Sequence, residues 1–392
     1  MNIKFMIKKQ KLAANVLFYM SFSLALSASI NTTAAETLLP NTALLGHEIP
    51  TTHLVYQEQA FKIYGDERSS LHREIDEVKN AAQVFKERFG KFGSLDVVIV
   101  ESPVSLFHVE STKYTKHFLP FLSYSALSSF HGTTASFDDS DKNILSHEVC
   151  HKFMILLMEQ EGLENVSSNT PRYGHTALPD WFDEIAAISC ESDILKARRL
   201  RDFYVSGNVE TLYSLSEFLT MEHPSLKAME KELSNLVKKA EMSANASGYA
   251  MEIMVIEEND TKPLLNNFYV QTLLFDKFIG AALGDDAMKQ LVKLMSQGHS
   301  IEDWLMSELK LDNKEQVNKA FKLFVDEEYK RSVEYSQFWE QLRQGVLFTD
   351  EFKRIGKGGK EIWIQASYNP ILDQNGRPHR VVKYAIDITG RK

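Results

Sequence analysis

The feature that most constrains this chain is a pair of histidines four positions apart, in the run His147-Glu148-Val149-Cys150-His151. The apolar pattern predicts a helix over residues 142–160. Residues four apart lie on one face of a helix, so both imidazoles can point at a single metal ion. The acid beside the first histidine can then reach a water on that metal. Zinc suits this set, because it accepts nitrogen and carboxylate ligands and leaves a position open for water.

A second predicted helix, over residues 179–192, supplies acids that can complete the site. Pro179 stands where a proline suits the first helical turn. Glu184 can provide a third, anionic ligand if this helix packs beside the first. Asp180 shares a helix face with Glu184 because it lies four residues away, and His175 is close in sequence. Both remain alternatives for the third ligand.

Together the two segments resemble the gluzincin metallopeptidases, the thermolysin-like zincins, and in particular their compact peptidase MA-like branch. That branch pairs an HExxH helix with a Leu-Pro-x-Trp-(Leu/Phe)-x-Glu-Gly-(Leu/Ile)-Ala helix, which residues 178–187 follow. The resemblance covers roughly residues 55–325. It implies that His147, His151 and Glu184 are zinc ligands and that Glu148 is the general base.

The chain departs from this family pattern at two positions. Ile185 stands where a glycine is usual, and Ile188 stands where some members keep an acid that supports a ligand. Both departures leave the expected ligand set intact. They bear on how efficiently such a site would work.

A further helix pattern, over residues 266–275, resembles the downstream helix that faces the site in this family. By that resemblance Tyr269 is expected to donate a hydrogen bond to the oxyanion of a tetrahedral intermediate, as donors at such positions do. A tyrosine buried in a helix interface is the alternative.

The wider pattern predicts an α+β fold: a zincin-like domain over residues 50–328, with a small mixed sheet and an active-site helix followed by mainly helical structure. A β-branched run over 95–100 predicts a buried strand, and 54–64 and 121–137 are expected to add strands. An apolar stripe from Leu71 to Phe89 predicts a helix that ends at Gly90. Later helices are expected over 264–283, 286–297, 301–310 and 313–328. Caps are expected at Ser300 and Asp312 and at glycines 284 and 298, and residues 239–262 are expected to form a loop or a mobile cover.

The two cysteines, Cys150 and Cys190, fall on the two helices that carry the expected ligands. In an oxidising compartment a bridge between them could lock the site. Cys150 precedes a ligand and faces away from the metal, however, so a buried free thiol is the favoured interpretation.

The N-terminus has the parts of a secretory signal peptide, expected over residues 1–35. Four lysines precede an apolar run over residues 16–26, and small residues follow it. An uncleaved membrane anchor is the alternative. The protein is therefore expected to be exported, either periplasmic or secreted. A net charge of −9 argues against nucleic acid as a partner.

The tail, residues 329–392, follows a different pattern. Three segments with alternating apolar residues are separated by glycine-rich turns, which predicts three antiparallel strands. Their order resembles the C-terminal half of a PAS domain of the kind found in chemoreceptors and sensor kinases. The half that would close a haem or flavin pocket is not recognisable, so no such cofactor is expected. Because three strands are marginal alone, the sheet is expected to dock on the peptidase-like domain, to pair with a second copy, or to stay partly disordered with an exposed edge.

These observations predict an exported, Zn²⁺-dependent metallopeptidase that hydrolyses peptide bonds of a peptide or protein substrate through a zinc-bound water. The alternative is a sensory or signalling protein with a PAS-like C-terminal module and a catalytically inactive zincin-like domain.

Overall fold

The computed structural model describes residues 52–66, 71–101, 109, 113–126, 144–163, 178–205, 212–224, 262–355 and 361–391. The expected signal peptide, His175 and nearly all of the 239–262 segment lie outside these ranges. The chain divides into two compact units. The first contains residues 1–192, 221–265 and 288–298, and the second contains 193–220, 266–287 and 299–392. Among the described helices, none has the length and apolarity that a membrane span requires.

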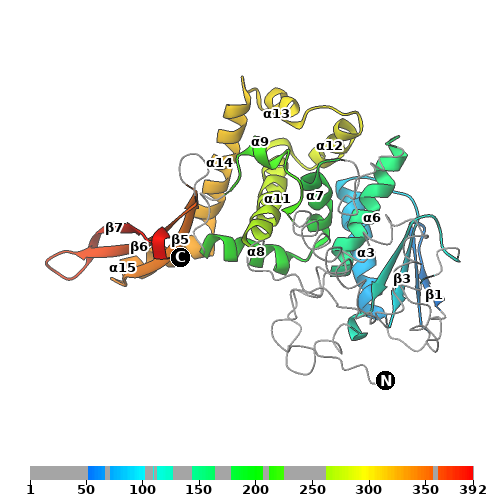
Figure 1. Ribbon diagram of the computed structural model, residues 1–392, viewed down its shortest axis with the longest axis horizontal. Helices are drawn as coiled ribbons and strands as arrows, with labels where there is room; N and C mark the ends of the chain where they lie inside the picture. The colour runs from blue at the N-terminus through cyan, green and yellow to red at the C-terminus, as the bar shows by residue number, and fades with distance from the viewer. Residues whose placement is uncertain are drawn as a thin grey trace, which may run out of the picture. The chain divides into compact units, whose positions relative to one another are not determined.

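The first unit contains a four-stranded mixed sheet whose strands lie in chain order (Figure 1). Strand β1 pairs antiparallel with β2, and the pairs β2–β3 and β3–β4 are parallel. All six residues of β3 are buried, as its β-branched run predicts. The strands are β1 (His53–Gln57), β2 (Phe61–Gly65), β3 (Leu95–Val100) and β4 (Phe118–Leu122), and the helices of this unit are α3 (His72–Arg88), α6 (Ile144–Gln160), α7 (Asp180–Cys190) and α12 (Ala287–Ser296).

Two strand expectations differ from the structure. Residues 54–64 form two strands, β1 and most of β2, that pair antiparallel with a bulge in β1. Of the strand expected over 121–137, residues 127–137 lie outside the described ranges, and of the rest only residues 121 and 122 are in a strand, because β4 ends at Leu122. There the Ser123 hydroxyl accepts a hydrogen bond from the Ala126 amide at 3.1 Å, which starts a helical turn instead. Hydroxyl side chains favour such local bonds over a sheet ladder.

Helix α3 packs against α6 through the apolar stripe that the sequence predicts. Phe85 and Phe153 are fully buried and their rings lie 5.6 Å apart, and Phe92 stacks on Phe153 at 3.9 Å. Gly90 follows the helix with φ of +122°, a conformation that L side chains rarely adopt. This contact sets the position of α6 against the rest of the unit.

A polar network then holds the N-terminal turn of α6. The Tyr124 hydroxyl donates to Glu77 Oε2 of α3 at 2.7 Å and accepts from the Leu145 amide at 3.2 Å. The Ser146 hydroxyl donates to the same Glu77 oxygen at 3.4 Å. Burial raises the pKa of Glu77 to about 7, although its hydrogen bond from Tyr124 and the charge of Arg73 act in the opposite direction. Amides that a helix start leaves unsatisfied are thus bonded by side chains from elsewhere in the unit.

The pKa of Glu77 makes the stability of this unit depend on pH. Because the pKa is raised on folding from about 4.5 to about 7, the folded state binds more protons between these values. Stability therefore falls as the pH rises through this window. Glutamine cannot ionise, so the stability of Glu77→Gln should not fall in this window. Between pH 4.5 and 8 the free energy of unfolding of the variant should therefore rise relative to that of the wild type by on the order of 2 kcal/mol. Urea unfolding of both proteins at several pH values measures this, and a difference that does not change with pH would contradict it.

The second unit is mainly helical and ends in a sheet. Phe275 of α11 lies 5.8 Å from both Phe218 of α9 and Phe321 of α14, at the centre of its core. The helices are α8 (Asp193–Val205), α9 (Leu215–Phe218), α11 (Lys262–Leu283), whose first residues fall in the first unit, α13 (Ile301–Leu309), α14 (Lys314–Arg331) and α15 (Val333–Arg343); the strands are β5 (Phe348–Ile355), β6 (Glu361–Leu372) and β7 (Pro378–Asp387), and a short 3₁₀ helix, η5 (Thr389–Arg391), closes the chain.

The helix signals of this part of the sequence are largely confirmed. The Ser300 hydroxyl accepts from the Asp303 amide at 3.2 Å, as its capping pattern predicts. The second cap is one residue later than expected, since Asn313 rather than Asp312 accepts from the Gln316 amide. Both glycines expected after helices, Gly284 and Gly298, have positive φ.

The tail forms the expected three-stranded antiparallel sheet, in the order β5-β6-β7 (Figure 1). Helix α15 packs on one face of it, where Phe338 lies 5.3 Å from Phe348 and 5.1 Å from Tyr368. On the opposite face, Tyr384 and Ile386 of β7 are more than 60 % exposed. The sheet therefore has one face covered within its unit and one that exposes apolar side chains.

Candidate metal site

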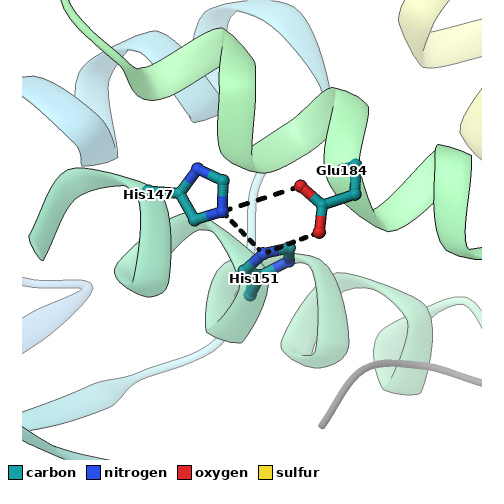
Figure 2. Close-up of side chains that lie close together, drawn as sticks. All are labelled: His147, His151 and Glu184. Atoms are coloured by element: carbon teal, nitrogen blue, oxygen red, sulfur yellow. Dashed lines mark hydrogen bonds and ion pairs between the residues drawn. The ribbon is translucent and has the colours of Figure 1, made fainter. Parts of the chain in front are cut away.

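Three of the predicted residues come together in the first unit. His147 and His151 project from α6 toward Glu184 of α7 (Figure 2). The two Nε2 atoms lie 3.2 Å apart. Glu184 Oε2 lies 3.6 Å from His147 Nε2, and Oε1 lies 3.7 Å from His151 Nε2. One ligand atom from each of the three residues can be chosen so that all three lie within 4.8 Å of one another. Ligands of a tetrahedral zinc lie about 3.4 Å apart, so the cluster is compact enough to close around one ion.

The site holds a carboxylate that lacks hydrogen bonds. The Glu184 side chain is fully buried, and neither of its oxygens has a hydrogen-bond donor among the described residues. Burial, together with the charges of nearby acids, raises the pKa of Glu184 to about 8 although His147 acts against this. A buried carboxylate without donors is costly. A divalent cation held by Glu184 and the two imidazoles would remove that cost, so these residues fit a metal.

The imidazole of His147 is oriented by an acid that the sequence did not reveal. Its Nδ1 lies 3.1 Å from Oε1 of the buried Glu191. Burial would lower the pKa of His147, but this hydrogen bond and the charges of Glu184, Glu191 and Glu148 raise it to about 9. An acid on the far nitrogen of a ligating histidine fixes which nitrogen faces the metal. Family resemblance pointed to position 188, whereas the acid is at the residue that caps the end of α7.

A second residue missed from the sequence is His223. Its fully buried side chain places Nε2 3.4 Å from Glu184 Oε1. Its backbone amide donates to Asp180 Oδ2 at 2.5 Å. Burial and the charge of His147 lower the pKa of His223 to about 3. Asp180 therefore bonds a backbone amide and is not among the three clustered ligand atoms. A lone histidine forty residues downstream carries no sequence signal for this place.

A disulfide joins the two helices that carry the ligands. Cys150 of α6 bonds Cys190 of α7, and their Cα atoms lie 6.5 Å apart. The expectation of a buried free thiol at Cys150 is therefore wrong. The expectation failed because α7 brings the second cysteine within reach. Closing a loop of this length stabilises a fold by about 4 kcal/mol in the chain-entropy account.

The two residues predicted to act on substrate lie in different units of the chain. Glu148 lies on α6 between the two ligands, where it is half-buried. Tyr269 lies on α11 in the second unit, half-buried, with the Arg199 guanidinium 4.9 Å from the centre of its ring. Its role as an oxyanion donor stays a prediction.

The tail can be compared with known proteins now that its fold is described. Residues 311–385 match the PAS fold. This match confirms the PAS part of the resemblance, and it begins earlier than the expected boundary at residue 329, so that it takes in α14 and α15 as well as the sheet.

A curated relative also supports the PAS part of the resemblance. Over 72 residues the chain is 43 % identical to the biofilm dispersion protein BdlA of Pseudomonas aeruginosa, a match that covers 18 % of this chain and 17 % of that protein. The chain thus spans less than a fifth of its relative's length. For the residues before the PAS-like region, the geometry of the candidate metal site is what supports the metallopeptidase prediction.

The role of Glu184 as the third ligand can be tested by removing its charge. We expect Glu184→Gln to lose most bound zinc, because an amide is a poor zinc ligand and, among the described residues, the cluster able to share one ion contains no other carboxylate. Native mass spectrometry measures the bound metal. Glu161→Gln, at an exposed acid just past α6, should retain zinc. Undiminished zinc in Glu184→Gln would remove the assignment.

Proposed function

We propose that this chain is an exported sensory or signalling protein in which a PAS-fold module is joined to a zinc-binding, zincin-like domain. The match of residues 311–385 to the PAS fold carries the proposal, supported by the similarity of this region to a protein named for biofilm dispersion. Export is supported by the Cys150–Cys190 bridge, since disulfides persist in oxidising compartments.

The PAS-like sheet is suited to contacts rather than to a cofactor. Its inner face is occupied by α15, and Ala366 at the centre of that face is fully buried. The other face carries an apolar stripe along β7 formed by Val382, Tyr384 and Ile386. Among the described residues, β7 pairs only with β6, so its outer edge is open to another strand. Such edges and stripes are sites of strand pairing.

The partner that fits this edge is a second copy of the chain. Antiparallel strands related by a two-fold axis pair about a central residue. If that residue is Tyr384, then Val382 of each copy faces Ile386 of the other and the two tyrosines face each other. This pairing joins the apolar stripes of both copies into one and places no like charges opposite, whereas pairing about Lys383 would oppose two lysines.

We expect the protein to dimerise through β7. Tyr384→Ser combined with Ile386→Ser should convert the dimer to a monomer, because it replaces the apolar stripe at the centre of the pairing. Sedimentation velocity at several concentrations measures the mass. Val333→Ser combined with Val346→Ser alters exposed apolar residues elsewhere in the tail and should stay dimeric. A monomeric wild type, or an unaffected double variant, would contradict this pairing.

A second candidate function, zinc-dependent peptide hydrolysis, is favoured by the geometry of the first unit. His147, His151 and Glu184 would hold the ion with the spacing described above, and Glu148 lies beside them on α6. Zinc in such a site lowers the pKa of a bound water and polarises a carbonyl group. Glu148 would accept a proton from the attacking water and deliver it to the leaving amine.

The two candidate functions differ in their dependence on Glu148. If the first unit is a peptidase, Glu148→Gln should keep its zinc and lose at least about 100-fold in hydrolysis, since only the general base is removed. If the domain is inactive, neither protein will cleave. The assay uses a mixed peptide library read by mass spectrometry, with bound zinc measured in parallel and a chelator-treated control. Cleavage that survives in Glu148→Gln would exclude the proposed mechanism.

A further inference from the structure

We propose that His223 is a positioning residue that holds the Glu184 carboxylate in place for metal binding, with Asp180 as its anchor. The proposal rests on the zinc site proposed above and deepens it. None of the sequence patterns that define the expected ligand set includes His223.

The geometry places His223 on one oxygen of the carboxylate, Oε1, which also lies 3.7 Å from His151 Nε2. His223 Nε2 lies 3.4 Å from Glu184 Oε1, whereas Oε2 lies nearest His147 Nε2, at 3.6 Å. The side chains of His223 and Glu184 are both fully buried. An imidazole N–H directed at Oε1 would restrict rotation of the carboxylate and leave Oε2 available to the ion. The distance is long for a hydrogen bond, and we expect it to shorten when the ionised carboxylate binds a cation.

His223 is held by the same helix face that carries the carboxylate it contacts. Asp180 and Glu184 lie four residues apart on α7, and both contact His223, one at its backbone and the other at its side chain. Asp180 accepts the backbone amide of His223 at 2.5 Å, and Glu184 faces the ring. Segment 221–224 is thereby fixed relative to α7 in both position and orientation. This assigns Asp180 the part of an anchor, where the sequence had left it as a rival ligand.

A ligand role for His223 is the alternative that the geometry disfavours. The cluster of atoms able to share one ion consists of one atom each from His147, His151 and Glu184. The contact of His223 with this cluster is the 3.4 Å approach of its Nε2 to Glu184 Oε1, and the charge of His147 also acts on its ring. A histidine that acts through a ligand in this way alters affinity while leaving the number and type of ligands unchanged.

The test compares two substitutions of His223 in the full-length protein. Glutamine places an amide N–H close to the position of Nε2, whereas leucine has similar bulk and no donor. We expect His223→Leu to weaken Zn²⁺ binding about 10- to 100-fold and His223→Gln to stay within about 3-fold of the wild type. Competition with a chromophoric chelator measures the dissociation constants. Thermal unfolding of the metal-free proteins shows whether each variant is folded.

Spectra of the Co²⁺-loaded proteins separate positioning from ligation. If His223 acts through Glu184, the visible absorption bands of Co²⁺ should keep their positions in His223→Gln, because the ligands are unchanged. A changed coordination spectrum in that variant would overturn the proposal in favour of a ligand role. Equal zinc affinity in His223→Leu and the wild type would overturn it in favour of simple packing.

A variant at the anchor covers the case in which His223→Leu does not fold. Asp180→Ala frees the backbone amide of His223 while keeping its imidazole, and it should weaken zinc binding several-fold, whereas Asp180→Asn retains an acceptor and should not. Equal affinity in all three proteins would refute the anchor role. If the wild type binds no zinc, the proposed site itself fails. If the wild type binds zinc and these variants match it, only the positioning proposal fails.

Discussion

The stability of the first unit depends on how it offsets the energetic cost of one fully buried carboxylate. Glu184 lies within 3.7 Å of three imidazoles and has no hydrogen-bond donor among the described residues. Taking an ionised carboxylate out of water costs several kcal/mol even after the protein relaxes. Without a cation, the group is most stable when protonated, and its raised pKa expresses this. A divalent ion would replace that proton and attract the same ring nitrogens, and it would thereby couple metal binding to the packing of α6 against α7.

The elements around the carboxylate all restrict the same two helices. The Cys150–Cys190 bridge ties α6 to α7, and both sulfurs lie 3.8 Å from the Ala81 carbonyl of α3. At the start of α6, Glu77 and Tyr124 bond the first helical turn. Ligands held this way need little reorganisation when an ion arrives, and preorganised ligands bind more tightly.

Features that depend on local periodicity could be predicted from the sequence. Contacts between segments that are distant in sequence were missed. His147 and His151 share a face because they lie four apart, which needs only helix geometry. Glu184 was expected as the third ligand because residues 178–187 resemble the gluzincin pattern. Glu191, His223 and the disulfide arise because segments distant in sequence meet, and no spacing rule encodes those meetings. The expectation for residues 121–137 failed for a different, local reason. Apolar residues there suggested a strand, but the Ser123 hydroxyl bonds the chain into a turn.

The exposure of the ligands bears on which proposed function the site can serve. His147 is 15 % exposed in its side chain, His151 5 % and Glu184 not at all, so solvent reaches the site past His147. A catalytic zinc needs an open position for water and a substrate carbonyl. A zinc that only senses or stabilises needs neither. The ligand set satisfies both roles, and what distinguishes them is whether a peptide can approach along the His147 side to within reach of Glu148. Approach of a peptide along that side therefore decides whether Glu148, the proposed general base, could act on a substrate.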